Sequence, residues 1–487
     1  MSTRSILAIV LFSGAAFASG PKYKKPEVTV PQAWQSPVPW QTANPADALP
    51  KNAWWKAFGD PELAQYEDRA IANNQTLKAA VARLGQAQAF ARVSSSAFFP
   101  EVGAGLSGQR QRLSANRPTN GARIVPTAVT QNVFNLPFTL NYEIDLFGRV
   151  RHSLETANAS LQASAADLEN VRLMISSELA ADYFQLRELD SEIAVVQKAV
   201  DFEKDGLQLV NRRHEGGAVS GLDVAQQQTV LNSSYTQLAL LQQQRAQFEH
   251  AVAALQGLPA SDFRAPVRPL DSQPPAVPLG LPSELLQRRP DVATAEREVA
   301  SANAQIGVAH AAFFPSLSLG GGGGLQSGDI TKLLDGPSGV WSLGLAALQP
   351  IVAGGRRRAQ MEEARAVYDE NVATYRETTL VAFQQVEDSL SGLNALSSAS
   401  ESQQRAVSDA ERSLTLANAR YTGGLVTYLD VITAQEQVLS NERLAAQIQG
   451  QRMVTSVLLV KAIGGGWDSA SLEAVGVKPS LHQVLQP

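Results

Sequence analysis

The sequence contains no cysteine, which excludes disulfide bonds, thiolate metal ligands and cysteine nucleophiles. Histidine is also scarce, and the five histidines form neither an HxxxH nor an HxH pair, so their spacing predicts no metal site. No nucleophile is paired with a base, and the glycine run from Gly320 to Gly324 lacks the Lys-Ser or Lys-Thr of a phosphate-binding loop. We therefore expect neither an enzyme nor a bound cofactor, and we expect the glycine run to lie in a strand.

Charged side chains are sparse as well. Only 18% of the residues are charged, below the usual quarter, and the formal net charge is −5. So small a net charge gives no reason to expect nucleic acid or an anionic membrane surface as a partner. The hydrophobic content of 44% over 487 residues is nevertheless enough for a sizeable core.

Long apolar runs are lacking. Near the start, a basic residue precedes the apolar run Ile6–Phe12 and then Ala16-Phe-Ala18, which together predict a secretory signal peptide over residues 1–18. A membrane-spanning helix needs about 20 apolar residues, and the best later run, Val457–Val460, is interrupted by Lys461. If the exported protein crosses a membrane, we expect it to do so with strands.

The sequence does contain a duplication. The stretch Arg213-His-Glu-Gly-Gly-Ala-Val-Ser-Gly-Leu-Asp223 returns 207 residues later as Arg420-Tyr-Thr-Gly-Gly-Leu-Val-Thr-Tyr-Leu-Asp430. Each copy is a Gly-Gly break between two long helical patterns, so the protein is expected to consist of two similar halves. Gly221 in the first copy corresponds to Tyr428 in the second, and we expect the second helical hairpin to do more of any closing.

Each half is predicted to contain a helix, a β-hairpin and two long helices. Apolar residues such as Tyr375, Phe383 and Leu390 step by three and four, which is typical of helices packed as a coiled coil. The predicted order is a signal peptide over 1–18, an extended N-terminal arm over 19–58, a first repeat over 59–258 (hairpin 101–146, long helices 149–256), a proline-rich link over 259–282, a second repeat over 283–463 (hairpin 316–351, long helices 355–463) and a C-terminal tail over 464–487.

The clearest strand is predicted from Phe134 to Leu146, where apolar and polar residues alternate without a break. Its length suits a transmembrane barrel strand of about 9–11 residues, which we favour over a strand of a soluble sandwich. Four such strands per chain cannot close a barrel, which needs at least about eight, so several chains are expected to share one. The polar face is expected to line a barrel lumen with Asn135, Asn141, Glu143 and Asp145.

Four stretches of the chain carry a family resemblance. They are Gly20-Pro-Lys-Tyr-Lys-Lys-Pro26, Trp54-Trp-Lys-Ala-Phe-Gly-Asp-Pro61, Arg289-Pro-Asp-Val292 with Ala295-Glu296, and Ile306-Gly-Val-Ala-His-Ala-Ala-Phe-Phe-Pro-Ser316. Together they resemble the outer membrane efflux proteins of the TolC, OprM and NodT type over nearly the whole chain. The first two are similar to the branch that serves resistance-nodulation-division pumps. Members of that branch often carry an acylated cysteine before the Gly-Pro motif, where this sequence has Ser19, so acylation is not expected unless a natural cysteine has been replaced.

The resemblance implies an α+β membrane protein, in which a trimeric 12-stranded transmembrane β-barrel, with four strands from each chain, continues into a long periplasmic α-helical barrel. Such a homotrimer lies in the cell outer membrane and extends into the periplasm. It would be the passive exit duct of a tripartite efflux pump for drugs, other toxic compounds or metal ions, with a periplasmic adaptor protein, an inner-membrane pump and outer-membrane lipid as partners. Two alternatives stay open: an exit duct for type I protein secretion, and a secreted coiled-coil scaffold.

The resemblance also implies roles for the duplicated breaks. The adaptor contact at the periplasmic tip is expected at Arg213, Gly216, Gly217, Arg420, Gly423 and Gly424. The gate is expected just inside the tip, where a ring of carboxylates would repel itself, at Leu222, Asp223, Leu429 and Asp430. Family members often have an aspartate where this chain has Thr433, so Asp430 is the candidate replacement. On the simpler alternative, the glycine pairs are tight turns and the two aspartates only stabilise helix starts.

Overall fold

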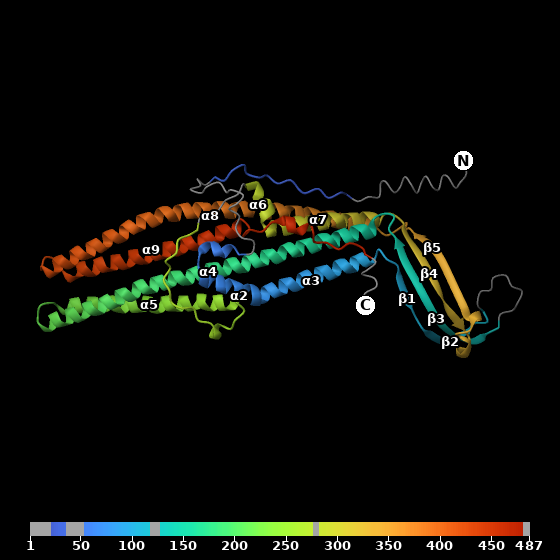
Figure 1. Ribbon diagram of the computed structural model, residues 1–487, viewed down its shortest axis with the longest axis horizontal. Coiled ribbons are helices and arrows are strands. Elements are labelled where there is room, and N and C mark those ends of the chain that lie inside the picture. Colours follow the sequence, from blue (N-terminus) through green and yellow to red (C-terminus); the bar gives the residue numbers. More distant parts are fainter. Residues whose placement is uncertain (1–20, 36–52, 117–126, 276–281, 481–487) are drawn as a thin grey trace.

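The computed structural model describes residues 21–35, 53–116, 127–275 and 282–480, so the predicted signal peptide lies outside the described residues. The molecule is elongated, with helices along most of its length and one β-sheet at an end (Figure 1). The predicted mixture of helix and sheet is therefore confirmed. None of the helices among these residues is long and apolar enough to cross a membrane.

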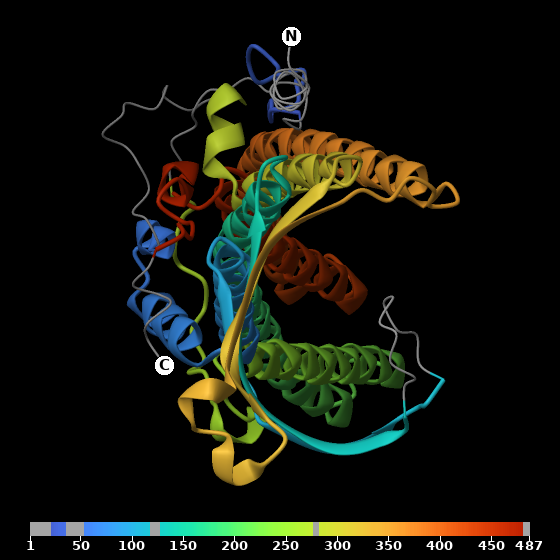
Figure 2. The same cartoon turned by 90° about the vertical axis from the view of Figure 1, so that its right-hand side faces the viewer.

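The described strands form one antiparallel sheet, consisting of β1 (Glu101–Ala104), β2 (Ser107–Leu113), β3 (Val129–Ile144), β4 (Ser316–Ser327) and β5 (Gly339–Leu348). Both β1 and β2 pair with the same side of β3 in one register, with Ala104 opposite Phe138 and Ser107 opposite Asn135. The sheet therefore has four strand lines, with β1–β2 and β5 at its edges. It bends into an open arc (Figure 2).

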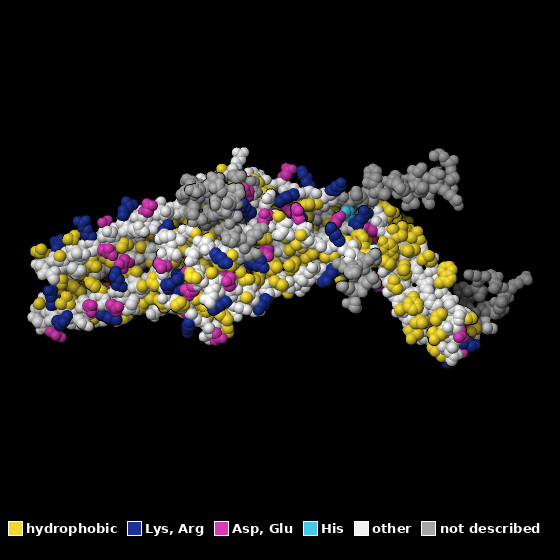
Figure 3. Space-filling view, viewed as in Figure 1, with side chains coloured by type: hydrophobic (Ala, Val, Ile, Leu, Met, Phe, Trp, Pro, Cys, Tyr) yellow, Lys and Arg dark blue, Asp and Glu magenta, His cyan; other side chains and the backbone are white. Residues whose placement is uncertain are grey.

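The two faces of the sheet differ in polarity, because successive side chains on a strand point to opposite faces. In the register of the sheet, one face collects Val102, Phe134, Leu136, Phe138, Leu140, Leu317, Leu319, Leu325, Trp341, Leu343 and Leu345. Much of this face is exposed in a single chain: Trp341 is 84% exposed and Leu343 70%. Figure 3 shows the hydrophobic side chains gathered over the strands.

The glycine run lies in β4, as predicted. Gly324 pairs with Pro137, and a Cβ atom added to it would come within 2.2 Å of the carbonyl oxygen of Leu136. Only glycine allows β3 and β4 to approach so closely at this point.

The two halves contain matching long helices, namely α4 (Arg149–Glu215), α5 (Gly221–Leu255), α8 (Arg356–Thr422) and α9 (Tyr428–Ala462). The helices α4 and α8 have 67 residues each, and α5 and α9 have 35. A straight helix of that greater length spans about 100 Å. The predicted apolar stripe is confirmed, since Tyr375, Phe383, Val386 and Leu390 of α8 are buried.

Shorter helices pack beside them: η1 (Trp54–Phe58), α2 (Pro61–Asn73), α3 (Gln75–Ser96), η2 (Ala260–Asp262), α6 (Pro282–Arg288), α7 (Pro290–Ala311) and η5 (Ser469–Leu472). Two more short helices, η3 (Ile330–Lys332) and η4 (Gly336–Ser338), lie in the connection between β4 and β5. Single helices were expected where α2–α3 and α6–α7 stand, and those expectations are wrong. The Asn74 side chain caps α3 by accepting from the amides of Thr76 and Leu77. In the second half, Pro290 disfavours helical backbone at Arg289, which is extended.

The N-terminal arm and η1 contact the helices. The rings of Trp34 and Phe383 have centroids 6.3 Å apart, and the Asn303 amide donates to the carbonyl of Pro21 at 3.1 Å. Trp54 and Trp55 are each 2% exposed. The described part of the arm, residues 21–35, thus lies on the helices.

A buried network of charges joins α4, α5 and the segment that follows α5. Asp190 of α4 is fully buried and accepts from Arg187 at 2.8 Å, from Arg245 at 2.6 Å and from the amide of Arg268 at 3.0 Å. Arg187 also contacts Glu62 of α2 at 2.9 Å. Because buried charges need partners, each side chain of this network depends on the others.

Candidate functional site

The first Gly-Gly break is a tight helix end. The Gly217 amide donates to the carbonyl of His214 at 2.9 Å, and the Ala218 amide donates to that of Arg213 at 2.8 Å. This pair of bonds is a Schellman motif, which requires a left-handed residue. Gly217 supplies that residue with φ +75°, whereas Gly216 has φ −79°.

The second break repeats this geometry at the end of α8. The Leu425 amide donates to the carbonyl of Arg420 at 2.9 Å, and Gly424 has φ +72° beside Gly423 at −78°. The two hairpin tips lie together at the end of the molecule opposite the sheet (Figure 1). The prediction of two matching turns is thereby confirmed.

Asp223 and Asp430 each complete a capping box at the start of the returning helix. Asp223 accepts from the amide and hydroxyl of Ser220 at 2.9 and 2.8 Å, and Asp430 accepts from those of Thr427 at 3.0 and 2.7 Å. The Thr427 hydrogen bond lowers the pKa of the Asp430 carboxyl. Both aspartates therefore have a structural role in the single chain, as the simpler alternative expects.

Apolar side chains near the tip are open to solvent in a single chain. Leu222 is 65% exposed, Leu425 72% and Leu429 51%. Thr433, at the position of the family's aspartate, donates its hydroxyl to the carbonyl of Leu429 at 2.9 Å. The predicted meeting of these residues at a gate remains a prediction that concerns more than one chain.

A contact between the two tips was not predicted. The guanidinium of Arg213 lies 5.1 Å from the ring centroid of Tyr421, whose ring packs on Tyr428 at 5.1 Å. Tyr428 is 5% exposed and donates its hydroxyl to Gln227 at 2.9 Å. Its hydroxyl oxygen would lie 3.0 Å from a Cβ atom at Gly206. The signals for this contact were the single glycine of α4 and the tyrosine that replaces Gly221 in the second repeat.

Further polar contacts join α4 to α9 above the tip, and we call the whole line of α4–α9 contacts the seam. Glu192 accepts from the guanidinium of Arg443 at 3.0 and 2.8 Å and from Gln447 at 3.1 Å. Lys198 contacts Glu442 at 3.1 Å. The seam is where the first hairpin meets the second, so any separation of the hairpins must break it.

One carboxyl of the seam is buried beside a second carboxyl. Glu188 is 5% exposed and packs on Gly450, where an added Cβ atom would lie 2.5 Å from its Cγ. It accepts a hydrogen bond from Gln185. Burial, and then the charge of Glu192, raise the pKa of the Glu188 carboxyl to about 8. The folded protein therefore binds a proton here that the unfolded chain releases at lower pH.

Replacing Glu188 with glutamine should flatten the pH dependence of stability. Since the folded pKa lies above the ordinary value, stability from this proton is complete in acid and is lost as pH rises towards 8, by at most about 1.4 kcal/mol per pH unit. Denaturation at pH 5, 6, 7 and 8 measures the slope, with the exposed Glu215→Gln as the matched control. Equal slopes in the parent and in Glu188→Gln would contradict this role.

The predicted lumen residues divide into two groups. Asn135, Asn141 and Glu143 lie on β3, on the face opposite the apolar one. The strand ends at Ile144, however, so the prediction that it includes Asp145 is wrong. The alternation of apolar and polar residues continues by chance to Asp145, which caps the start of α4 instead.

The Asp145 carboxylate accepts from the amides of Val150 and Arg151 at 3.2 and 2.9 Å, which are among the first of α4. Glu143 pairs with Arg149 at 2.5 Å. Glu143, near the end of β3, and Asp145, just past it, thus neutralise Arg149 and Arg151 at the start of α4. The assignment of Asn135, Asn141 and Glu143 to a lumen remains a prediction.

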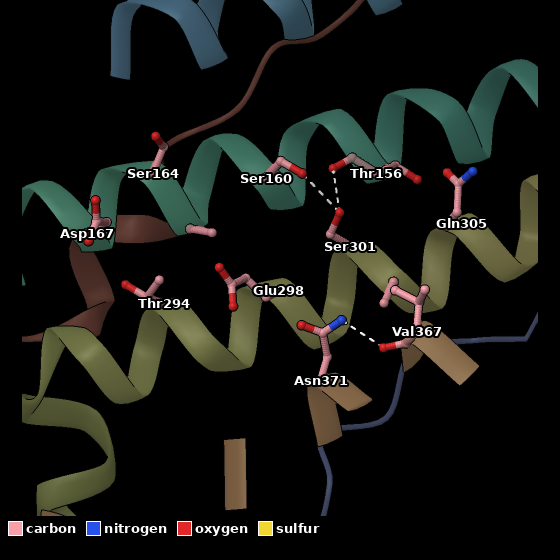
Figure 4. Close-up of a pocket in the computed structure, with 12 residues that line it drawn as sticks. Thr156, Ser160, Ser164, Asp167, Thr294, Glu298, Ser301, Gln305, Val367 and Asn371 are labelled. Atoms are coloured by element: carbon pink, nitrogen blue, oxygen red, sulfur yellow. Dashed lines mark hydrogen bonds between the residues drawn. The ribbon is translucent and has the colours of Figure 1, made fainter. Parts of the chain in front are cut away.

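A polar cavity of about 700 Å³ lies among α4, α7 and α8. Figure 4 shows hydroxyl, carboxyl and amide side chains along its wall, with Ser160 and Ser301 hydrogen-bonded at 2.9 Å. Burial, and then the charge of Asp167, raise the pKa of Glu298. The residues that line the cavity include no histidine, cysteine or lysine. Among the residues that the structure describes, no cluster of His, Cys, Asp and Glu is suited to hold a metal ion.

Comparisons with known proteins agree with this architecture. The model of the family described as outer membrane efflux protein matches residues 67–258 and 281–465. The pyoverdine export outer membrane protein OpmQ of Pseudomonas aeruginosa is 35% identical over 470 residues, which cover 96% of this chain and 98% of the relative. The toluene efflux pump outer membrane protein TtgC of Pseudomonas putida is 31% identical, with 96% of each chain covered.

Solved structures are similar along nearly their whole length. The outer-membrane channel OprN matches with a TM-score of 0.85 and 27% identity, covering 92% of this chain and 99% of its own. The CmeC outer membrane channel of Campylobacter jejuni matches with a TM-score of 0.84 and 26% identity, covering 93% and 95%.

Proposed function

This chain belongs to the outer membrane efflux protein family, and from this premise we propose that three copies form the passive exit duct of a tripartite pump for small molecules. The protein is an outer-membrane component of an efflux system and extends into the periplasm. The relatives are channel proteins rather than enzymes.

The sheet carries the proposal of a shared barrel. One face is apolar and exposed, and β1–β2 and β5 leave two open edges. Open edges are not stable in lipid, so each is expected to pair with the opposite edge of a neighbouring chain. Three chains with four strand lines each would close a 12-stranded barrel. The apolar alternation from Phe134 to Ile144 matches the length that a bilayer requires, about 9–11 residues.

The hairpin tips support the proposed contact with a periplasmic adaptor protein and, through it, with an inner-membrane pump. They lie at the end of the helices that is remote from the sheet (Figure 1). Arg420 and the paired glycines are exposed there, whereas Arg213 is half-buried against the ring of Tyr421. Leu222, Leu429, Asp223 and Asp430 are proposed to form the gate, because a threefold axis would bring copies of these residues together.

The proposed cargo is a small molecule. Relatives are named for pyoverdine export and for the efflux of toluene, solvents and antibiotics. A duct for type I protein secretion is the alternative within the same fold, and a secreted coiled-coil scaffold is the alternative outside it. The apolar sheet face disfavours the scaffold, because exposed patches of this kind mark membrane or protein contacts.

Reconstitution tests the proposal. The protein extracted from outer membranes with detergent should behave as a trimer and should form discrete channels in planar bilayers. Deletion of its gene should raise sensitivity to small toxic compounds without stopping the secretion of proteins. A protein that stays soluble and monomeric without detergent would rule out the channel, and a secretion defect alone would favour the protein duct.

The proposed gate makes a separate prediction. Replacing Asp430 with asparagine removes the charge but leaves an oxygen that can accept from Thr427, so any increase in leakage reports the charge rather than the cap. We expect higher closed-state conductance in Asp430→Asn, measured in planar bilayers. Asp223→Asn makes the same change in the other hairpin, where we expect a smaller leak because the second hairpin is expected to do more of the closing. Asp201→Asn, at an exposed carboxylate of α4 outside the proposed gate, is the matched control. If only Asp430→Ala leaks, the aspartate acts through its capping box, which is worth about 1 kcal/mol.

A further inference from the structure

The two junctions between sheet and helix are copies of each other in sequence. The 207-residue offset that relates the hairpin tips also relates Arg149 and Arg151, at the start of α4, to Arg356 and Arg358, at the start of α8. Each pair of arginines follows a strand and a glycine. If the acidic residues were duplicated as well, the two junctions would have the same net charge. Their net charges differ.

At the first junction the arginines are neutralised within the chain. Arg149 pairs with Glu143 at 2.5 Å, and Arg151 pairs with Asp145 at 3.1 Å. Both carboxylates come from the end of β3 and the residue just past it. This junction has no excess charge to offer to a partner.

At the second junction the acidic partners are missing. In the repeat, Pro350 stands for Glu143 and Val352 stands for Asp145. The guanidinium of Arg357 donates to the carbonyl of Pro350 at 2.7 Å, which holds the corner against the helix start. Within the part of the chain that the structure describes, no carboxylate forms an ion pair with Arg356, Arg357 or Arg358.

The corner between β5 and α8 also exposes apolar side chains. Ile351 is 93% exposed and Val352 88%. These two residues follow shortly after β5, whose apolar face carries Leu343 and Leu345. Three arginines that form no ion pair among the described residues thus follow two exposed apolar side chains, Ile351 and Val352, at the end of the sheet nearest the helices.

We propose that this corner, residues 348–358, binds the phosphate of an anionic phospholipid in the periplasmic leaflet. Ile351 and Val352 enter the acyl region while the arginines meet the headgroup. Arginine suits this contact, because its planar fork bonds two phosphate oxygens and its stem covers apolar surface. The proposal rests on the proposed function, since it needs the sheet to lie in the outer membrane. The small net charge of the whole chain conceals this local excess.

A phospholipid fits the corner better than phosphorylated outer-leaflet lipid. The corner lies at the helical end of the sheet (Figure 1), which faces the periplasm in the proposed orientation. A neighbouring subunit is the other candidate occupant, because β5 is an edge strand. Lipid binding and dissociation of the trimer, measured on the same variant, separate these two occupants.

The first test removes the three charges together. Binding of phosphatidylglycerol and of phosphatidylethanolamine to the detergent-purified trimer is counted by native mass spectrometry. In Arg356→Gln/Arg357→Gln/Arg358→Gln we expect the preference for phosphatidylglycerol to fall about fivefold per arginine. The matched control removes three exposed arginines farther along α8: Arg365→Gln/Arg376→Gln/Arg412→Gln. Unchanged preference, or an equal loss in the control, overturns the proposal. So does a trimer that dissociates more readily while its lipid preference is unchanged, because the corner then contacts a neighbouring subunit.

The second test locates the apolar side chains. The sequence has no native cysteine, so Ile351→Cys carries a single fluorophore, and brominated phosphatidylglycerol in vesicles should quench it. Leu343→Cys, on the apolar face of β5, is the reference. Quenching at 343 but not at 351 overturns the lipid corner and leaves the channel intact. No quenching at either position shows that the proposed function itself fails.

Discussion

Replacing Asp190 with alanine should lower the free energy of unfolding by about 3–5 kcal/mol, because two arginines lose a buried carboxylate partner at once. Of their acidic partners, Arg187 then keeps only Glu62, and Arg245 keeps only Glu249. Asp190 is fully buried, and both Arg187 and Arg245 donate to it. Arg187 is only 1% exposed, so water cannot replace the lost partner. The loss should appear in denaturant unfolding of the detergent-solubilised protein as a lower midpoint with an unchanged slope.

A matched control lies on the same helix. Asp201 pairs with Lys204 at 3.3 Å, and its side chain is 63% exposed. Exposed pairs contribute about 0–1 kcal/mol, so Asp201→Ala should barely shift the midpoint. Equal shifts in the two variants would mean that the buried network is not what stabilises this region.

Replacing Tyr428 with alanine should loosen the tip and raise leakage through the channel. The ring is buried against Tyr421, and the loss of a buried aromatic side chain costs about 3–5 kcal/mol. Gln227, which is fully buried, would lose the hydrogen bond that it accepts from the hydroxyl of Tyr428. Conductance in planar bilayers measures the leak, and hydrogen exchange of residues 206–228 measures the local opening.

Tyr428→Phe separates packing from hydrogen bonding at the same position. It keeps the ring and removes one hydrogen bond, which is worth about 0.5–1.5 kcal/mol, so its leak should be much smaller. A Tyr428→Ala protein with normal exchange and normal conductance would show that the seam does not restrain the tip.

The long helices and the tips could be predicted because their signals are local. Between Arg149 and His214 no proline interrupts the pattern, and both glycine pairs stand where the backbone must turn. The break at Asn74 escaped prediction because a capping side chain leaves only a weak signal in the sequence. At Asp145 the sequence gives a misleading signal, because this helix-capping residue continues the alternation of the strand before it.

The contacts between distant parts of the chain could not be predicted in the same way. Asp190 and Arg245 are 55 residues apart, and Glu192 and Arg443 are 251 apart. Their pairing depends on how the helices pack, which the spacing of residues along the chain does not encode. Gly206 is the single glycine of α4 and so marks a candidate close contact. The sequence does not show that its partner is Tyr428, which lies on α9.

The continuity of α4 makes it a lever. From Asp190, where the buried network holds it, to its end at Glu215 there are 25 residues, or about 38 Å. A tilt of about 5° at that fulcrum would displace the far end by about 3 Å, given the rise of 1.5 Å per residue. Under the proposed gating, such a tilt would move the end of α4 by about as much as the 2.9 Å that separates the hydroxyl of Tyr428 from Gln227. The long helix would then turn a small angular change beside the network into a separation of the two hairpins at the proposed gate.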